Sequence, residues 1–369
     1  MGEGVAGTPT VYDVAGRAGV SIATVSRVYR SPESVREATR ERVLVAAREL
    51  GYVPSGNARG LASRSTGVLG LCFPDYSDPD AESEAASVDA DDDHAFMLYS
   101  DQIIRGMERA ARRHGYALLI AASLTGGPES LVAKVAGRVD GCAVLARTVP
   151  TEDLEVISRR LPVVMLAGPP EQDGPGGLDR LDHIEVANAE GQRELTRHLI
   201  EDHGLRRLTF VGGIEDSPDA EARFAGFRDA CRAAGLPVPD EPDLRAELMT
   251  QAGGARAAEE LVDRAGPGGL PEGVLFANDQ MAVGALHALA RRGLRVPEDL
   301  AVTGFDGIPL GRLVQPALTT VRQPMRRLGE EAVELLVRRL AEERRGEPES
   351  LVLPVEVVRR ASCGCGHQA

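Results

Sequence analysis

The stretch that decides how this chain begins to fold is residues 11–28, VYDVAGRAGVSIATVSRV. Apolar residues at positions 11, 14, 15 and 18 follow the spacing of one helix face, and Thr10 with Asp13 is typical of a capped start. Gly19 tolerates a positive φ, and Ser21 can accept hydrogen bonds from the first turn of a second helix. These residues predict two short helices joined by a tight turn.

The second predicted helix has an inner and an outer face. At about 100° per residue, Val25 and Val28 share one face, whereas the other carries Ile22, Ala23 and Arg27. Small outer residues let a helix enter the major groove of DNA, where arginine can donate two hydrogen bonds to guanine and apolar groups can touch thymine methyls. The pattern predicts a DNA-reading helix-turn-helix. The competing interpretation is a helical hairpin in the core of some other protein.

Residues 37–50 predict a third helix that closes a small core with the first two. Gly51 is placed to end it, and Ser34 with Glu37 has the spacing of a capping box at its start. Residues 54–62, PSGNARGLA, follow. Gly56 and Gly60 each weaken a helix by about 1 kcal/mol relative to alanine, so alone this segment would be a poor helix.

The charge of the chain is unevenly distributed. Its 369 residues carry a net charge of −14. Residues 1–66 hold 9 Arg against 6 Asp and Glu, a charge of +3, so the remaining 33 basic and 50 acidic residues carry −17. A basic head and an acidic body direct phosphate attraction to one end of the protein.

Neither a signal-like N-terminus nor an apolar run approaching about 18 residues is present, so we expect a cytoplasmic protein.

Five cysteines fit a reducing compartment better than a disulfide framework. Three of them lie in predicted strands or helices. Cys363, Cys365 and His367 form a C-x-C-x-H pattern near the chain end, but a structural zinc site needs a fourth ligand. We predict a frayed tail here and no metal site.

From residue 66 onward, short apolar runs alternate with amphipathic stretches. The predicted strands are residues 68–73, 117–121, 142–145, 163–166, 183–186, 208–211, 273–276 and 300–305. The predicted helices are residues 101–114, 190–203, 220–234, 255–264, 280–292 and 326–343. Buried strands joined by helices form parallel sheets, so the fold class is α/β. We expect a headpiece over residues 1–54, a hinge over 55–65 and a two-lobed body over 66–369.

The first 61 residues resemble the headpiece of the LacI/GalR (lactose-repressor) family of bacterial transcriptional regulators. The resemblance rests on residues 11–15 (VYDVA), 19–21 (GVS), 24–28 (TVSRV), 51–54 (GYVP) and 58–61 (ARGL). It implies that the bases are read by Ile22, Ala23 and Arg27. It implies phosphate contacts near Tyr12, Ser21, Thr24 and Ser26. It implies that residues 58–61 form a hinge in which Ala58, Arg59 and Leu61 contact the minor groove, with the leucine wedged into the central base step. Because this segment is a poor helix alone, we expect it to become helical only on DNA, beside a partner subunit.

The resemblance continues through the body. It rests there on residues 139–141 (VDG), 161–164 (LPVV), 223–227 (RFAGF), 277–282 (ANDQMA), 304–306 (GFD) and 318–324 (LTTVRQP). It implies a body like a periplasmic sugar-binding protein, with an effector in the cleft between the lobes. The effector-binding residues that we predict are Tyr99, Ser100, Arg223, Asn278, Asp279 and Asp306. Helix capping explains Asn278 and Asp279 equally well, and a turn is the alternative for Asp306.

Several positions depart from the family pattern. Ala167 and Gly168 stand where an Asp-Arg pair is usual, Ala187 replaces an aspartate, and Met249 replaces a common aromatic residue. The chain has no Trp, so few rings can stack on a sugar. Residues 75–93 add nine Asp and Glu with no Lys or Arg. A solvated loop is the simpler interpretation of this acidic segment, and a lid that repels anionic ligands is the other.

Together these patterns predict a homodimeric regulator that binds a palindromic operator in double-stranded DNA. The leading hypothesis is a repressor controlled by a small molecule, a sugar or a sugar derivative. The alternative keeps DNA binding but replaces the small molecule by a protein corepressor or by no signal. We expect neither an enzyme nor a cofactor, because no nucleophile pair, P-loop or metal triad has usable spacing.

Overall fold

The computed structural model describes residues 9–53, 65–75, 98–124, 135–145, 148–149, 151–166, 181–215, 217–246, 248–265, 269–342 and 346–366. The chain divides into two compact units, Met1–Thr66 and Gly67–Ala369. We call the first the headpiece and the second the body. The predicted fold class is confirmed: a helical headpiece is followed by an α/β body with two mainly parallel sheets, in which only the described pair β10–β12 is antiparallel.

The headpiece is a bundle of the helices α1 (Val11–Ala18), α2 (Ile22–Arg30) and α3 (Glu37–Leu50), with the short 3₁₀ turn η1 (Pro32–Ser34) between the last two. Its core is made of small aliphatic side chains, among which Val14, Val25 and Val43 are fully buried. Gly51 ends α3 with φ 66°, a left-handed conformation that glycine adopts without strain. The predicted helices and their inner faces are therefore confirmed.

Of the two predicted helix N-terminal capping boxes, the one at α1 is confirmed and the one at α3 is not. At α1, the Asp13 carboxylate accepts hydrogen bonds from the Thr10 backbone N–H at 2.8 Å and from its hydroxyl at 2.7 Å. At α3, the prediction of a Ser34–Glu37 capping box is wrong. Arg36 occupies the N-cap, and the Ser34 hydroxyl donates to the carbonyl oxygen of Ser31 at 2.6 Å because Ser34 belongs to the preceding turn η1.

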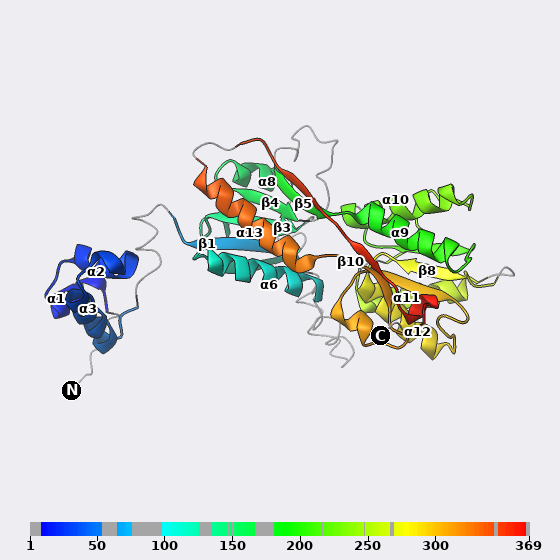
Figure 1. Ribbon diagram of the computed structural model, residues 1–369, viewed down its shortest axis with the longest axis horizontal. Coiled ribbons are helices and arrows are strands. Elements are labelled where there is room, and N and C mark those ends of the chain that lie inside the picture. Colours follow the sequence, from blue (N-terminus) through cyan, green and yellow to red (C-terminus); the bar gives the residue numbers. More distant parts are fainter. Residues whose placement is uncertain are drawn as a thin grey trace. The chain divides into compact units, whose positions relative to one another are not determined.

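The body contains two six-stranded sheets, one in each lobe (Figure 1). The first lobe has the strand order β11-β5-β4-β3-β1-β2, and the second lobe β12-β10-β9-β8-β6-β7. The strands of the first sheet are β1 (Val68–Asp75), β2 (Ala117–Leu124), β3 (Gly141–Leu145), β4 (Val163–Leu166), β5 (Asp182–Val186) and β11 (Ser350–Leu353). Those of the second are β6 (Leu208–Gly212), β7 (Leu244–Arg245), β8 (Gly273–Phe276), β9 (Ala301–Asp306), β10 (Thr319–Arg322) and β12 (Glu356–Val358).

Helices cover both sheets. They are α6 (Leu98–Arg113), α8 (Thr151–Ser158), α9 (Asn188–Glu201), α10 (Pro218–Ala233), α11 (Gln251–Asp263), α12 (Asp279–Arg291) and α13 (Met325–Ala341). The pairs α6 with α13, α9 with α10, and α11 with α12 pack against each other. In Figure 1 the α9–α10 pair and the α11–α12 pair lie on opposite sides of the second sheet. This is the doubly wound arrangement that a buried parallel sheet requires.

Alternate residues of the first sheet face two separate cores. Leu71 and Leu166 pack into the core that includes α6 and α13, whereas their neighbours Cys72 and Met165 pack into the core that includes α8. Successive side chains of a strand point to opposite faces, so an apolar run is buried on both sides. This explains why the strands read as unbroken apolar stretches in the sequence.

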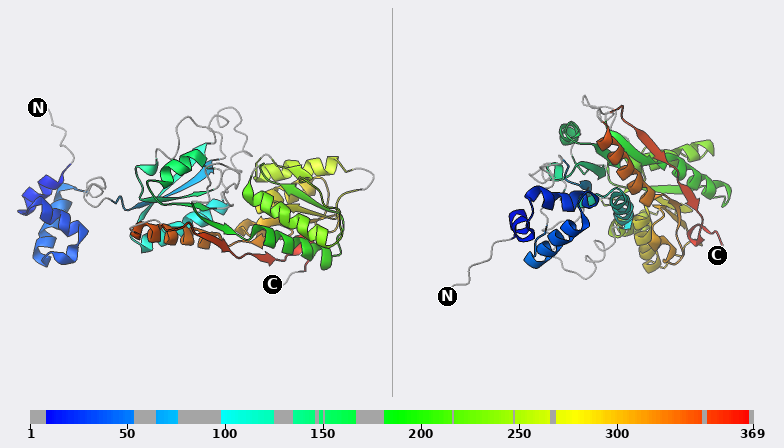
Figure 2. Two further views of the ribbon diagram at one scale, coloured as in Figure 1. Left: turned by 90° about the horizontal axis from the view of Figure 1, so that it is seen from above. Right: turned by 60° about the vertical axis from the view of Figure 1, so that its left-hand side comes forward.

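The chain passes between the lobes three times, at residue 187, at residues 323–324 and at residues 354–355. The last passage is the red C-terminal segment, which spans both lobes in Figures 1 and 2. Gly191 in the first turn of α9 fits beneath it, because a Cβ there would collide with Val355 and Val321. The lobes are therefore joined by a compact set of connections rather than by one linker.

Sequence patterns missed one helix and four strands among the described residues: α8, β7, β10, β11 and β12. The four missed strands have two to four residues and each contains a polar or charged residue, whereas β4 and β8, which are equally short, are apolar and were predicted. Among the described residues, no helix is long and apolar enough to cross a membrane.

Candidate DNA-reading and effector sites

The outer face of α2 is open to solvent. Val25 and Val28 are buried, with 0% and 3% of their surface exposed, whereas Ile22, Ala23 and Arg27 are exposed. No described residue forms an ion pair or hydrogen bond with the Arg27 guanidinium. Ile22 keeps 39% of its surface exposed although it is a large aliphatic residue. The three predicted base-reading residues thus share one accessible helix face.

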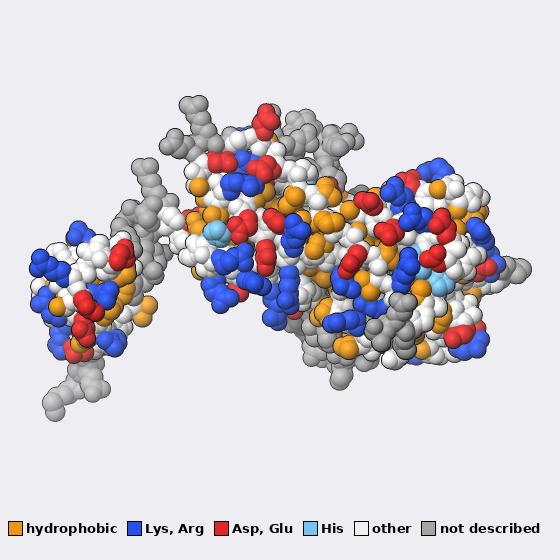
Figure 3. Space-filling view, viewed as in Figure 1, with side chains coloured by type: hydrophobic (Ala, Val, Ile, Leu, Met, Phe, Trp, Pro, Cys, Tyr) orange, Lys and Arg blue, Asp and Glu red, His pale blue; other side chains and the backbone are white. Residues whose placement is uncertain are grey.

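The four predicted phosphate contacts lie around the start of α1 and α2. The Ser21 hydroxyl accepts a hydrogen bond from the Thr24 backbone N–H at 3.2 Å, and the two hydroxyls lie 2.9 Å apart. Ser21 therefore caps α2, as the sequence predicts. Tyr12 is 70% exposed on α1, and Ser26 is half-buried. Figure 3 shows arginine side chains spread over the visible face of the headpiece, which suits an anionic partner.

The predicted hinge residues Ala58, Arg59 and Leu61 lie outside the described part of the chain, as do His367, Ala167 and Gly168. Most of the acidic segment 75–93 does as well. Their predicted roles stay predictions.

In the body, Arg223 of α10 is the centre of a buried polar network. Only 3% of its surface is exposed. Its Nε donates to Oδ1 of Asn188 at 2.9 Å, and its Nη1 donates to the carbonyl oxygen of Ala277 at 2.6 Å and lies 3.3 Å from Oδ1 of Asp306. The guanidinium also stacks 3.9 Å from the centre of the Phe305 ring. The network therefore holds this cation rigidly, without bulk water.

Asp306 ends β9 with φ 120°, a left-handed conformation that is rare for a non-glycine residue. Its Oδ1 accepts from Nε2 of Gln323 at 2.6 Å, and no described residue hydrogen-bonds its Oδ2. Burial raises the pKa of this carboxyl to about 6, although the Arg223 charge and the Gln323 amide favour the ionised form. A strained, buried carboxylate at the carboxyl end of a parallel strand is the kind of group that ligand sites use.

Asn278 and Asp279 are bound tightly by the protein itself. The Asn278 side chain caps α12 by accepting from the Met281 N–H at 2.9 Å, and its Nδ2 donates to the Met249 carbonyl at 2.9 Å. Asp279 is fully buried, and its two oxygens accept from the Thr320 hydroxyl at 2.5 Å and the Ile308 N–H at 2.8 Å. Burial, with the nearby Asp306 charge, raises the pKa of Asp279 to about 8. This geometry favours the capping interpretation for Asn278, whereas the Asp279 side chain bonds to β10 and to the segment after β9 and does not cap α12.

Tyr99 and Ser100 lie in the first turn of α6, in the first lobe. Ser100 is 8% exposed and Tyr99 packs against the core of that lobe. They therefore belong to a different lobe from the Arg223 network.

Sequence reasoning missed three members of the network: Asn188, Asp219 and Gln323. The Asn188 amide donates to Oδ1 of Asp219 at 2.8 Å while its oxygen accepts from Arg223. Asn188 follows the predicted strand 183–186, so the rule that selected Asp306 would also have selected it. Gln323 gave no such signal because β10 was not predicted. Asn188 and Gln323 flank two of the three passages between the lobes, so the network lies where the lobes are joined.

Comparison with known proteins finds a matching family model in each of the two parts of the chain that hold these sites. Residues 10–55 match the family described as "Bacterial regulatory proteins, lacI family", and residues 196–363 match a periplasmic binding protein-like domain. The chain is 31% identical over 358 residues to the HTH-type transcriptional repressor CytR of Escherichia coli strain K12, covering 96% of each protein.

This chain belongs to the lacI family. It is a DNA-binding transcriptional regulator with a periplasmic-binding-protein-like body. Another lacI-family relative is the ribose operon repressor of Escherichia coli K12, 32% identical over 341 residues, with 90% of this chain and 93% of that protein covered. These relatives are named as regulators and not as enzymes.

Solved structures of the lacI family agree. A lac repressor dimer bound to operator and the anti-inducer ONPF has a TM-score of 0.76 and 26% identity, covering 96% of this chain and 99% of that one. A complex of the transcriptional regulator CelR with cellobiose has a TM-score of 0.67 and 31% identity, with the same coverage.

The C-terminal segment corrects one sequence-based expectation for this lacI-family chain. The prediction of a frayed tail is wrong for Cys363 and Cys365, because residues Ala361–Cys363 form the 3₁₀ turn η5 and Cys363 is 3% exposed. The C-x-C-x-H pattern offers no fourth metal ligand in the sequence, but in the structure His198 and His203 lie beside the two thiols. Residues 198 and 363 are too far apart in sequence for a spacing rule to connect them.

Proposed function

We propose that this protein binds a palindromic operator as a homodimer, represses transcription from it, and is released by a small molecule that binds the body. The observation that carries the DNA part is the outer face of α2. Ile22, Ala23 and Arg27 are exposed there, while the opposite face of the same short helix is fully buried in the headpiece core. A helix anchored by one face and presenting small residues and one arginine on the other can enter a major groove.

Dimer formation follows from the operator geometry that this class of reader needs. A single headpiece reads a half-site of a few base pairs, and two headpieces related by a twofold axis read a palindrome. The lac repressor structure that this chain resembles is a dimer bound to operator. In our proposal the hinge residues Ala58, Arg59 and Leu61 contact the minor groove at the centre of the operator.

For the body we propose a polyol effector, a sugar or a sugar derivative. Arg223 and Asp306 supply a fixed guanidinium and a carboxylate with one oxygen that no described residue bonds, a pair suited to neighbouring hydroxyl groups. The relative CelR is in complex with cellobiose. Tyr99 and Ser100 would contribute from the first lobe. We assign Asn278 and Asp279 to the same site as residues that shape it.

Two measurements test the proposal. Selection of bound genomic DNA followed by footprinting should reveal a palindromic site, protected on both halves. A panel of sugars and sugar phosphates should then include a compound that raises the melting temperature of the protein and releases the footprinted DNA.

Either part can fail separately. Protection of an asymmetric site, or none, would contradict the operator proposal. A palindromic footprint that no compound of the panel weakens would contradict the sugar proposal and favour a protein corepressor. An Arg223→Lys variant that retains the response to the active sugar would remove Arg223 from the effector site.

A further inference from the structure

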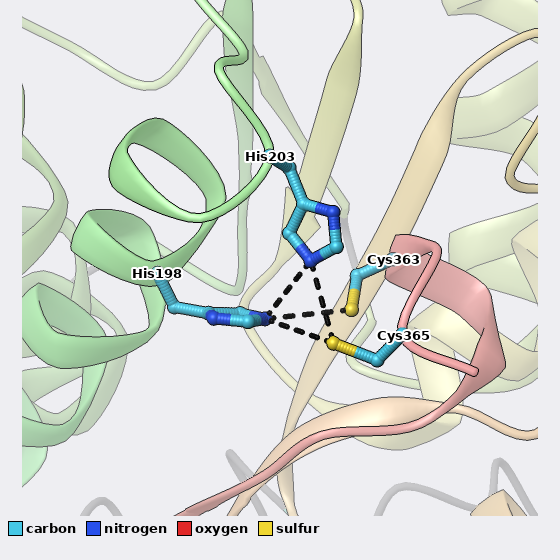
Figure 4. A group of neighbouring side chains, drawn as sticks. All are labelled: His198, His203, Cys363 and Cys365. Atoms are coloured by element: carbon cyan, nitrogen blue, oxygen red, sulfur yellow. Dashed lines mark hydrogen bonds between the residues drawn. The ribbon is translucent and has the colours of Figure 1, made fainter. Parts of the chain in front are cut away.

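Four side chains from distant parts of the chain meet at one point of the second lobe (Figure 4). His198 belongs to α9 and His203 follows that helix, while Cys363 ends η5 and Cys365 lies two residues further on. Their ligand atoms all lie within 4.8 Å of one another. His198 and Cys363 are 4% and 3% exposed, so the point where the four side chains meet is largely shielded from solvent.

Four of the six distances between the ligand atoms are close to the edges of a tetrahedral metal site, and all six are within 4.8 Å. Nε2 of His198 lies 3.2 Å from Nε2 of His203, 3.6 Å from Sγ of Cys363 and 3.5 Å from Sγ of Cys365. Sγ of Cys365 lies 3.4 Å from Nε2 of His203. A tetrahedron with Zn–N of about 2.05 Å and Zn–S of about 2.3 Å has edges of about 3.3 Å between nitrogens and about 3.6 Å between nitrogen and sulfur.

Neighbouring groups orient two of the four side chains. Nδ1 of His198 lies 2.7 Å from Oδ2 of Asp202. An ionised carboxylate only accepts, so Nδ1 carries the proton and the lone pair of Nε2 points into the cluster. The Thr319 hydroxyl contacts Sγ of Cys363 at 3.1 Å and can donate to a thiolate. Hydrogen bonds of these kinds hold metal-bound histidines and thiolates in place.

The backbone also brings the second cysteine back to the cluster. Gly364, between the two cysteines, has φ 95°, and its Cα faces the His203 ring: a Cβ there would lie 3.5 Å from Nδ1. The turn reverses the chain so that both thiols of the C-x-C pair face the histidines. A residue with a side chain would be strained in this conformation.

We propose that His198, His203, Cys363 and Cys365 bind one Zn²⁺ per chain in a structural Cys₂His₂ site. Two thiolates and two imidazoles are the ligand set that favours tetrahedral zinc over magnesium or calcium, which take oxygen ligands. Four protein ligands leave no open position for water, so the site is structural rather than catalytic. The ion would tie the C-terminal segment to α9, two parts of the second lobe whose ligands His198 and Cys363 are 165 residues apart in the sequence.

Two other arrangements of the same residues predict different results. In one, the four groups only hydrogen-bond to each other, and the protein takes up no metal. In the other, the two cysteines form a disulfide, and the reduced protein again holds no metal. Both alternatives are outcomes of the measurement below.

The test uses the full-length protein, purified under reducing conditions without a polyhistidine tag. Elemental analysis should find about one zinc per chain after extensive dialysis. Exchange for Co²⁺ should produce the intense visible bands of a tetrahedral site together with sulfur-to-cobalt charge transfer. Removing the zinc with a chelator should lower the melting temperature, and adding zinc back should restore it. A reduced protein that contains no zinc and takes up no Co²⁺ would overturn the proposal.

Variants make the assignment specific to these residues. Cys365→Ala should lose the cobalt bands, whereas Cys231→Ala, which removes a buried cysteine of α10 that is not one of the four, should keep them. His203→Cys should still bind one Co²⁺, with stronger charge transfer from its third thiolate, so a variant that folds is available. Cobalt spectra of Cys365→Ala that equal those of the unmutated protein would overturn the assignment, as would loss of the bands in Cys231→Ala.

Discussion

The two sites of this regulator are built in opposite ways. On α2 of the headpiece, Ile22, Ala23 and Arg27 are exposed, and the Arg27 side chain makes no polar contact with another described residue. In the body, Arg223, Asp306 and Asn188 are buried, and Arg223 is hydrogen-bonded to Asn188 and ion-paired with Asp306. A residue of the first kind can change without affecting the fold, whereas a residue of the second kind supports both the site and the lobe. Mutations should therefore separate binding from stability in the headpiece and couple them in the body.

The largest expected effect is that of Arg223→Ala on the stability of the body. Removing the cation leaves Asp306 buried without its partner, which costs about 3–5 kcal/mol. Urea unfolding monitored by circular dichroism measures the loss. Arg232→Ala is the matched control, because that arginine lies on the same helix α10 but is 58% exposed at its side chain. A loss below about 1 kcal/mol for Arg223→Ala would show that the network does not stabilise the lobe.

The next effect is a pH dependence caused by Asp279. Its pKa is raised from 3.8 to about 8 in the folded protein, so the folded state holds a proton that the unfolded state releases. The unmutated protein should therefore lose stability as pH rises from 5 to 8, by at most about 1.4 kcal/mol per pH unit. Asp279→Asn lacks this titration. The stability difference, variant minus unmutated protein, should grow over this range; a constant difference would contradict the buried, protonated carboxyl.

Arg27→Ala should weaken operator binding by about 1–3 kcal/mol per half-site and relax the preference at one base pair. The free energy of unfolding should be unchanged, because the side chain is exposed. Quantitative gel shifts on the footprinted site and on single-base variants measure both effects. Arg42→Ala, an equal change of charge on the exposed side of α3, is the control. An equal loss on every DNA sequence would mean that Arg27 contacts only phosphate.

The smallest effect concerns Ser21, which connects stability with DNA contact inside the headpiece. Ser21→Ala should destabilise the headpiece by about 1 kcal/mol, because the Thr24 N–H loses its capping acceptor. Ser21→Asp should restore the cap but place a negative charge beside the DNA phosphates. Thermal unfolding should therefore recover in Ser21→Asp while DNA affinity falls further. Recovery of both would show that Ser21 lies away from the phosphates.

Local patterns were enough to predict most of the fold. The three headpiece helices follow from apolar spacing and from Gly19 and Gly51, because helix-forming signals lie within a few residues of each other. Eight strands of the body were predicted from their apolar runs. The short strand β10 was not, because four residues in a loop-like context carry no periodic signal; it is formed by pairing with β9 and β12.

The functional sites show the same division between features that local sequence patterns predict and features that they do not. The outward face of α2 was predictable residue by residue, since a helix places its side chains by a fixed angle per residue. In the body, Arg223 and Asp306 were each predicted as site residues. Their contact with each other was not predicted, nor were the roles of Asn188 and Gln323. Those contacts join residues that lie 17 positions apart for Asp306 with Gln323 and 306 − 223 = 83 positions apart for Arg223 with Asp306.

The sequence by itself therefore determined the class of this protein, its helix-turn-helix, the face of α2 that meets solvent and the α/β character of its body. These properties rest on helix caps, on glycine positions and on the periods of helices and strands, all of which act over a few residues. The tertiary structure alone decided which polar groups are buried together. It enclosed Arg223 with Asp306 and brought His198 and His203 to Cys363 and Cys365. Burial and contact between such distant residues arise only when the sheets and helices pack, because packing sets both the distance between charges and their separation from water.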